Sequence, residues 1–211
     1  MEVNNSSRWA EFSGGTVGWD VGLNTTGVQH IHLLQDYARA YHNAARSVFE
    51  AFRQTAERNR REMDAHSLVF LYRHALEVHL KTIIVWGEGL QILRGSPPKP
   101  RKQTFKDHDL AKLLPGVKDI FSLIDCSGIW NVPMYQSFTD IERVAQAVNE
   151  FPHDGFRYPI GHAGETELLP CGVSFNVIVF AEKLDGLLDL LEAAATCTWD
   201  TYQIEARTHI L

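Results

Sequence analysis

The segment from about residue 65 to 93 constrains the fold most, because apolar side chains cover nearly its whole circumference when it is drawn as a helix. One narrow polar strip remains, and it holds Arg73, His74, Glu77 and Lys81. A helix that is apolar on almost every side lies in the centre of its domain. We therefore expect a central helix here, with the strip as either a thin solvent-facing edge or a functional groove.

Other segments repeat apolar residues at steps of three and four, the spacing of an amphipathic helix. A short segment after Asp107, the expected N-cap, should break at Pro115 and Gly116, because proline interrupts helices. The expected helices span 29–61, 65–93, 107–124 with that break, Ser137 or Thr139 to Phe151, and Ser174 to Ala195. Such segments without an intervening strand predict an all-α fold, an antiparallel up-and-down helical bundle of about five helices.

The two ends of the chain differ in composition from this body. Residues 1–28 contain five glycines and are expected to form an extended N-terminal arm. Residues 29–196 are the predicted helical bundle domain, and the length of 211 residues suits one domain with a real core. Residues 197–211 are predicted to be a C-terminal tail, in which the alternation of polar and apolar residues indicates a short strand.

The composition argues against several classes of protein. The formal net charge is −6, whereas domains that grip nucleic acid with their whole surface are usually basic. No apolar run approaches the ~18 residues of a membrane helix, and the N-terminus lacks an apolar signal core. The cysteines Cys126, Cys171 and Cys197 include no CxxC pair, which indicates reduced thiols. We expect a cytoplasmic protein without a membrane partner.

The polar strip of the 65–93 segment is the first candidate site. His74, Glu77 and Lys81 follow one another at steps of three and four, so they share one helical face. Arg73 and Glu77 are four residues apart and can form an ion pair. An acid, a base and a cation on one face can bind an anion or transfer a proton. The alternative is a network of ion pairs that closes the bundle.

His108 and Asp109 form a second candidate, just before an apolar turn. A His–Asp pair suits metal binding or general-base catalysis, and the alternative is that it caps a helix. Arg157, Tyr158 and His162 form the third candidate. An arginine can hold a phosphate and a histidine can move a proton. The alternative is that Arg157 folds back onto a carboxylate while Tyr158 fills the edge of the core.

Ten histidines make metal sites worth testing, but the known ligand patterns are missing from the sequence. There is no HExxH motif, no paired ExxH set and no cluster of cysteine and histidine. The nucleotide-binding motifs GxxxxGK[ST] and GxGxxG and the nucleophile motif GxSxG do not occur either. The sequence therefore predicts no metal and no cofactor.

The stretch Phe70 to Lys81, followed after a loop by His108 to Leu114, resembles the central part of HEPN-type helical-bundle proteins. Phe156 to Pro159, before the last helix, resembles a segment of uncharacterised bacterial members of that group. The resemblance covers about residues 30–195. It implies a helical bundle that forms a homodimer and acts in a bacterial defence or toxin–antitoxin setting.

The resemblance implies two kinds of function. Many HEPN proteins bind a nucleotide, RNA or a partner protein without catalysis, and others are metal-independent ribonucleases with an R-x4-6-H motif. Arg157 and His162 match that spacing, Arg157 as the group that holds the scissile phosphate and His162 as the general acid or base. Because Pro159 and Gly161 lie inside the motif, we expect the non-catalytic module, with the endoribonuclease as the alternative. The expected ligand-binding residues are Arg73, His74, Glu77, Lys81, His108, Asp109 and Tyr158.

Overall fold

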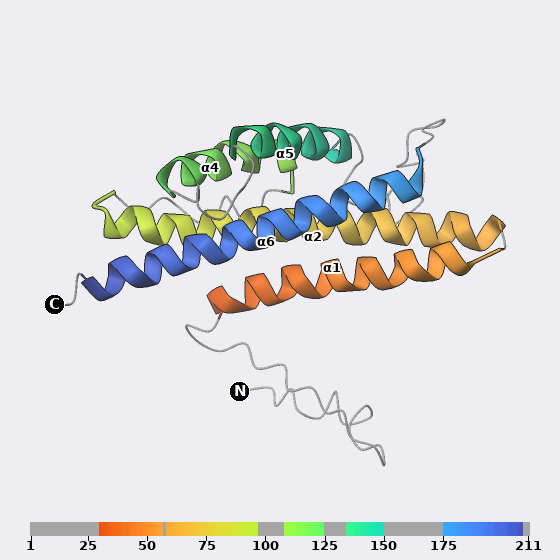
Figure 1. Cartoon of the computed structure of the whole chain (residues 1–211), viewed down its shortest axis with the longest axis horizontal. Helices are drawn as coiled ribbons and strands as arrows, with labels where there is room; N and C mark the ends of the chain where they lie inside the picture. Colours follow the sequence, from red (N-terminus) through yellow and green to blue (C-terminus); the bar gives the residue numbers. More distant parts are fainter. Residues whose placement is uncertain (1–29, 57, 97–107, 125–133, 150–174, 209–211) are drawn as a thin grey trace, which may run out of the picture. The chain divides into compact units, whose positions relative to one another are not determined.

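The computed structural model of the chain describes residues 30–56, 58–96, 108–124, 134–149 and 175–208. These residues contain five helices and no strand: α1 (His30–Gln54), α2 (Arg58–Leu93), α4 (Leu110–Leu123), α5 (Met134–Asn149) and α6 (Val177–Thr208). The predicted all-α helical bundle is thereby confirmed (Figure 1). The chain divides into two units, Met1–His30 and Ile31–Leu211, and the predicted arm of residues 1–28 lies outside the described residues.

The α2 helix is the central element of the second unit, as its apolar circumference predicts. Many of its large apolar side chains are fully buried, among them Leu68, Tyr72, Leu76, Leu80, Ile83 and Leu90. Both α6 and α4 pack against it, and α5 packs against α4. In Figure 1, α4 and α5 lie on one side of α2 and α1 lies on the other. Burial on several sides explains why apolar side chains cover most of the circumference of α2 from Leu68 onward.

The α2 and α6 helices run parallel, although they are far apart in the sequence. Near the start of both helices, the Tyr72 hydroxyl donates to Asp185 over 2.8 Å. Near their ends, the Arg94 guanidinium donates to Glu205 over 3.0 Å. The sequence separations of the two pairs, 113 and 111 residues, are nearly equal, so the two helices stay in register along their length. The rings of Trp86 and Trp199 meet between these points.

The other helix directions follow from similar pairs of contacts. Arg73 donates to the carbonyl oxygen of His108, and Arg94 donates to that of Leu123, so α4 runs parallel to α2. Alternation of direction therefore fails at one step, between α2 and α4. The α1 helix is antiparallel to α6, because its residues pair in reverse order with those of α6: Gln35 with Thr196, Arg39 with Glu192 and Arg46 with Asp189.

The boundary between the first two helices differs from the prediction. The α1 helix ends at Gln54 and α2 begins at Arg58, whereas the first helix was expected to reach residue 61. Phe52 is the last apolar residue of the α1 stripe, so burial of apolar side chains does not stabilise the helix beyond this turn. The Thr55 amide and hydroxyl then donate to the carbonyl oxygens of Phe52 and Ala51, which terminates the last turn.

The expectation of a break at Pro115 is wrong, because α4 continues through Pro115 to Leu123. Proline removes one backbone hydrogen bond, and Pro115 faces solvent. The buried side chains around it outweigh that loss: Leu110, Leu113, Leu114, Val117, Ile120 and Phe121. The N-cap is Asp109, whose carboxylate accepts from the amide of Ala111 over 3.0 Å, whereas Asp107 lies outside the described residues.

The predicted C-terminal strand is also wrong, because α6 extends to Thr208 and crosses the expected boundary at residue 197. The alternating pattern there belongs to a helix whose residues face α2 at helical spacing. Trp199 packs against Trp86, and Tyr202 lies beside Gly89. The α5 helix spans Met134–Asn149, and so begins before the predicted caps and ends before Phe151.

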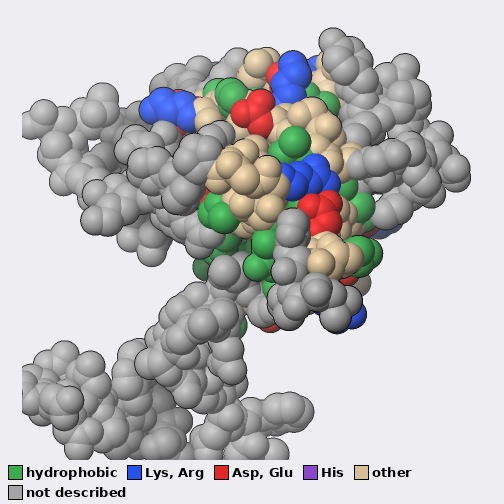
Figure 2. Space-filling view, turned by 90° about the vertical axis from the view of Figure 1, so that its left-hand side faces the viewer, with side chains coloured by type: hydrophobic (Ala, Val, Ile, Leu, Met, Phe, Trp, Pro, Cys, Tyr) green, Lys and Arg blue, Asp and Glu red, His purple; other side chains and the backbone are tan. Residues whose placement is uncertain are grey.

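The surface charges, the state of Cys197 and the apolar character of the helices can each be compared with the predictions. On the end-on face shown in Figure 2, basic and acidic side chains lie next to one another. Cys197 is disulfide-bonded, so the expectation of reduced thiols is wrong for this residue. Among the described helices, none has the length and apolar character required to cross a bilayer.

Candidate functional site

The polar strip of α2 forms a buried ion network centred on Glu77. Lys81 donates to one carboxylate oxygen of Glu77 over 2.7 Å, and Arg73 approaches the other at 3.4 Å. All three side chains are at least 94% buried. Their spacing of four residues on one helix places each cation one turn away from the carboxylate. The strip is therefore a closed set of paired charges rather than an open groove.

His108, just before α4, joins this network from a different segment. Its Nδ1 lies 2.9 Å from a carboxylate oxygen of Glu77, and its carbonyl oxygen accepts from Arg73 over 2.8 Å. The His108 side chain is 49% exposed, which makes it the accessible edge of the network. The contacts fasten the start of α4 to α2. We call Arg73, Glu77, Lys81 and His108 the Glu77 cluster.

The charge state of Glu77 follows from these contacts. Burial alone would raise the pKa of Glu77, because a carboxylate loses its hydration. The hydrogen bonds and charges of Lys81 and His108 outweigh this effect and hold the pKa below its usual value. Glu77 is therefore ionised at neutral pH, and the cluster gathers guanidinium, ammonium and imidazole groups around one carboxylate.

The remaining predicted site residues are not brought into the Glu77 cluster by direct contacts. His74 stacks on Phe70 and meets the ring of Tyr41 edge-on, with ring centroids 4.3 Å apart in the second case. Burial lowers the pKa of His74. Asp109 caps α4 and accepts from the Asn149 amide group over 2.8 Å. This is the capping role that the sequence offered as an alternative.

Arg157, Tyr158 and His162 lie outside the described residues. Their predicted roles stay predictions, and so does the alternative in which Arg157 folds back onto a carboxylate.

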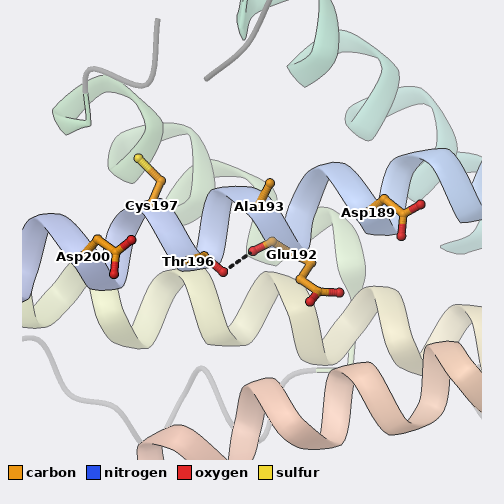
Figure 3. A pocket seen from close by; sticks show the side chains of 6 residues that line it. All are labelled: Asp189, Glu192, Ala193, Thr196, Cys197 and Asp200. Atoms are coloured by element: carbon orange, nitrogen blue, oxygen red, sulfur yellow. Dashed lines mark hydrogen bonds between the residues drawn. The ribbon is translucent and has the colours of Figure 1, made fainter. Parts of the chain in front are cut away.

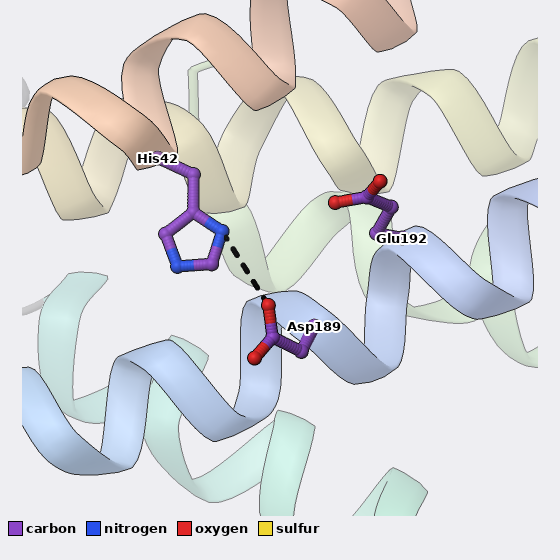
Figure 4. Close-up of side chains that lie close together, drawn as sticks. All are labelled: His42, Asp189 and Glu192. Carbon is purple, nitrogen blue, oxygen red and sulfur yellow. Dashed lines mark ion pairs between the residues drawn. The ribbon is translucent and has the colours of Figure 1, made fainter. Parts of the chain in front are cut away.

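A second polar cluster, which sequence reasoning missed, lies between α1 and α6 (Figure 4). His42 on α1 is buried, and its Nε2 lies 2.8 Å from Oδ1 of Asp185 on α6. Its Nδ1 lies 3.9 Å from Oδ1 of Asp189, and Glu192 stands one turn further along α6. One ligand atom from each of His42, Asp189 and Glu192 falls within 4.8 Å of the others. We call these three residues the His42 triad.

Asp185 is the anchor beside this triad. Its Oδ1 atom also accepts from the hydroxyl of Tyr72 and from the guanidinium of Arg46, over 2.8 and 3.2 Å. Burial and the contact with Asp185 raise the pKa of Tyr72, so the hydroxyl stays protonated and donates. Arg46 reaches on to both oxygens of Asp189, and Arg39 donates to Glu192 over 2.6 Å. Long cationic side chains thus connect α1 to α6.

A surface pocket of about 440 Å³ adjoins the triad on α6. It is lined by Asp189, Glu192, Ala193, Thr196, Cys197 and Asp200, which are spaced along the helix in Figure 3. Three of the six carry a carboxylate and none carries a positive charge. The pocket is therefore suited to a cation or a hydrogen-bond donor, not to a phosphate.

A signal for this cluster was present in the sequence. Asp185, Asp189 and Glu192 recur at steps of four and three, which places three carboxylates on one face of the last helix. His42 lies on the buried stripe of α1, between Ala38 and Ala45. No local pattern pairs α1 with α6, because their contacts join residues about 140 positions apart in the sequence.

His79 on α2 is a fully buried histidine at the same level of the bundle. Neither ring nitrogen of His79 has a hydrogen-bond partner among the described residues. The contacts of Tyr72 with Asp185 and of Trp86 with Trp199 bracket it on α2, which sets it opposite Glu192. Burial, together with the nearby charges of His42 and Arg39, lowers the pKa of His79 to about 3.

His79 predicts a dependence of stability on pH. Its pKa rises from about 3 in the folded chain to 6.5 in the unfolded chain, so the unfolded chain binds the extra proton. This destabilising effect of His79 on the folded chain is absent above pH 6.5 and grows as the pH falls toward 3. From pH 7 to pH 5, the free energy of unfolding should fall by about 2 kcal/mol through this group.

The measurement is urea denaturation of wild type and of His79→Leu across this pH range. On acidification from pH 7 to pH 5, the free energy of unfolding of His79→Leu should fall by about 2 kcal/mol less than that of wild type. Equal pH dependence in both proteins would mean that His79 takes up its proton in the folded state.

Comparison of this chain with protein-family models, with curated proteins and with solved structures finds no match. The geometry itself defines an all-α helical bundle with two polar clusters, one on each side of α2. The Glu77 cluster gathers cationic groups, and the His42 triad gathers metal-ligating groups.

Proposed function

We propose that the protein is a HEPN-like, non-catalytic binding module whose ligand is a nucleotide or RNA phosphate held at the Glu77 cluster. The observation that carries the proposal is that Arg73, Lys81 and His108 gather around the one carboxylate of Glu77, with His108 half exposed. Guanidinium, ammonium and imidazole groups are the side chains that bind phosphate. A ligand phosphate would contact the cluster at the His108 edge, next to the start of α4.

The start of α4 lies beside this edge, because His108 is two residues before the first residue of α4. The first amides of α4 are already paired, that of Leu110 with Asn149 and that of Ala111 with Asp109. The imidazole of His108 is therefore the group that would meet a phosphate at this edge. The remaining parts of the proposal rest on the resemblance alone: a homodimer, a partner protein, and a setting in bacterial defence or a toxin–antitoxin pair.

Binding of a fluorescently labelled nucleotide and a short single-stranded RNA tests the proposal. Replacement of His108 by alanine should weaken binding about tenfold, which corresponds to ~1.4 kcal/mol. Lys183→Ala on α6 is the control, because it removes an exposed basic side chain far along the sequence from the cluster. Binding that is absent, or that both variants weaken equally, would leave the Glu77 cluster as a structural network.

The alternative is a metal-independent endoribonuclease that uses Arg157 and His162. It is supported by the R-x4-6-H spacing in the sequence. Cleavage of total RNA in the presence of EDTA, abolished by Arg157→Ala and by His162→Ala, would favour the enzyme over the binding module. The cytoplasmic location stays a prediction, and the disulfide at Cys197 does not favour it, since disulfides persist mainly in oxidising compartments.

A further inference from the structure

The His42 triad has the composition and the placement of a metal site. It joins one imidazole from α1 to two carboxylates one turn apart on α6. His42 is buried, while Asp189 is 57% and Glu192 is 31% exposed, so the triad opens to solvent on the α6 side. The residues come from two helices, and the site exists only when α1 lies on α6.

Asp185 sets the orientation of the His42 ring. In the neutral imidazole, the Nε2–H group donates to Asp185 over 2.8 Å, and Nδ1 then carries a lone pair. That lone pair is on the side of Asp189, whose Oδ1 is 3.9 Å away. Metal-ligating histidines typically donate their second N–H to a carboxylate in this way, which fixes the ring and raises its basicity. Tyr72 and Arg46 hold Asp185 in turn.

From this geometry we propose that His42 Nδ1, Asp189 and Glu192 bind a divalent transition metal ion, with Zn²⁺ as the representative ion. A nitrogen ligand with two carboxylates suits zinc and its neighbours, whereas Mg²⁺ and Ca²⁺ take oxygen ligands. Ligand atoms around tetrahedral zinc are about 3.4 Å apart, so the triad must close by roughly 1 Å. The exposed carboxylates on α6 can supply this movement by rotation of their side chains.

The neighbourhood supports this assignment at two points. The pocket of about 440 Å³ is lined by Asp189 and Glu192, so a water molecule or a small ligand can reach a fourth coordination position. On the opposite side, buried His79 lies at the level of the triad without a hydrogen-bond partner among the described residues. Polar groups on α1, α2 and α6 thus lie around the three proposed ligands.

Two arginines compete with the metal for the same carboxylates. Arg39 holds Glu192 and Arg46 holds Asp189, so a bound cation must displace or share these ion pairs. This competition gives the proposal a signature that a purely structural network lacks. Removal of a ligand should weaken metal binding, whereas removal of a competing arginine should strengthen it.

The test is calorimetric titration of Zn²⁺ into the full chain after treatment with a chelator, with Co²⁺ absorption in the visible range as a second measurement. Wild type should bind one ion at the triad. Asp189→Asn and Glu192→Gln should each weaken zinc binding at least tenfold and alter the cobalt spectrum. Glu182→Gln is the matched control on α6, because Glu182 is exposed and lies outside both the triad and the pocket lining, and it should leave the affinity unchanged.

Arg39→Met should raise the zinc affinity severalfold, because it releases the Glu192 carboxylate. Zinc binding that Asp189→Asn and Glu192→Gln both leave unchanged would place the metal elsewhere in this histidine-rich chain and overturn the proposal. No zinc binding, or a lower or unchanged affinity in Arg39→Met, would also overturn it and leave an ion-pair network between α1 and α6. Neither result bears on phosphate binding at the Glu77 cluster, which is measured with a different ligand.

Discussion

Replacement of Glu77 by alanine is expected to lower the free energy of unfolding by about 3–5 kcal/mol, as removal of one partner from a buried ion pair does. Arg73 and Lys81 are at most 6% exposed at the side chain, so water cannot replace the lost carboxylate. The loss should also loosen the start of α4, since His108 contacts Glu77 directly. Urea denaturation followed by circular dichroism measures the effect.

Glu182→Ala is the matched control for this prediction. Glu182 lies on the exposed face of α6, and substitutions at such positions change stability by about 0.5 kcal/mol or less. A loss below ~1 kcal/mol for Glu77→Ala would show that the two cations reach solvent or other partners in the variant.

Two glycine-to-alanine substitutions in helices should change stability in opposite directions. A Cβ atom on Gly87 of α2 would overlap the Ile120 side chain of α4, whose Cγ2 atom would lie 2.5 Å away. That atom is fixed to the branched Cβ of Ile120, so the two helices must separate. We expect Gly87→Ala to cost about 1–3 kcal/mol despite the better helix propensity of alanine.

Gly186→Ala on α6 is the counterpart, because a Cβ atom there meets nothing within 4 Å. It should stabilise the protein by about 0.5–1 kcal/mol through helix propensity alone. Thermal or urea denaturation of both variants provides the comparison. Equal effects of the two substitutions would mean that α2 and α4 are not in close contact at Gly87.

The sequence predicted the helices best where one periodic pattern decided the outcome. The all-round apolar surface of residues 65–93 identified α2 as the central helix, because few other environments suit such a surface. The predictions failed where local signals competed with packing. Pro115 indicates a break by itself, but the buried leucines on both sides keep α4 intact. The residues after Ala195 alternate like a strand, but Trp86 and Gly89 provide a surface for a helix.

The candidate sites, like the helices, could be predicted only where one local pattern contained all the residues. Arg73, Glu77 and Lys81 could be grouped from the sequence, because they lie on one helix and their spacing is fixed. The contact of His108 with Glu77 and the contact of His42 with Asp185 join separate helices or segments, so no local pattern contains them. Spacing can list the polar residues of each face, but tertiary packing decides which faces meet.

The parallel pairing of α2 with α6 has a consequence for synthesis on the ribosome. The hydrogen bond between Tyr72 and Asp185 joins residues 113 positions apart. At roughly 5–20 residues per second, about 6–23 s pass between the emergence of the two partners. During this interval the central helix α2 lacks the neighbour that covers one of its sides. The nascent chain thus exposes apolar surface of α2 for seconds. A chaperone that binds apolar segments would act on α2 until α6 has been synthesised.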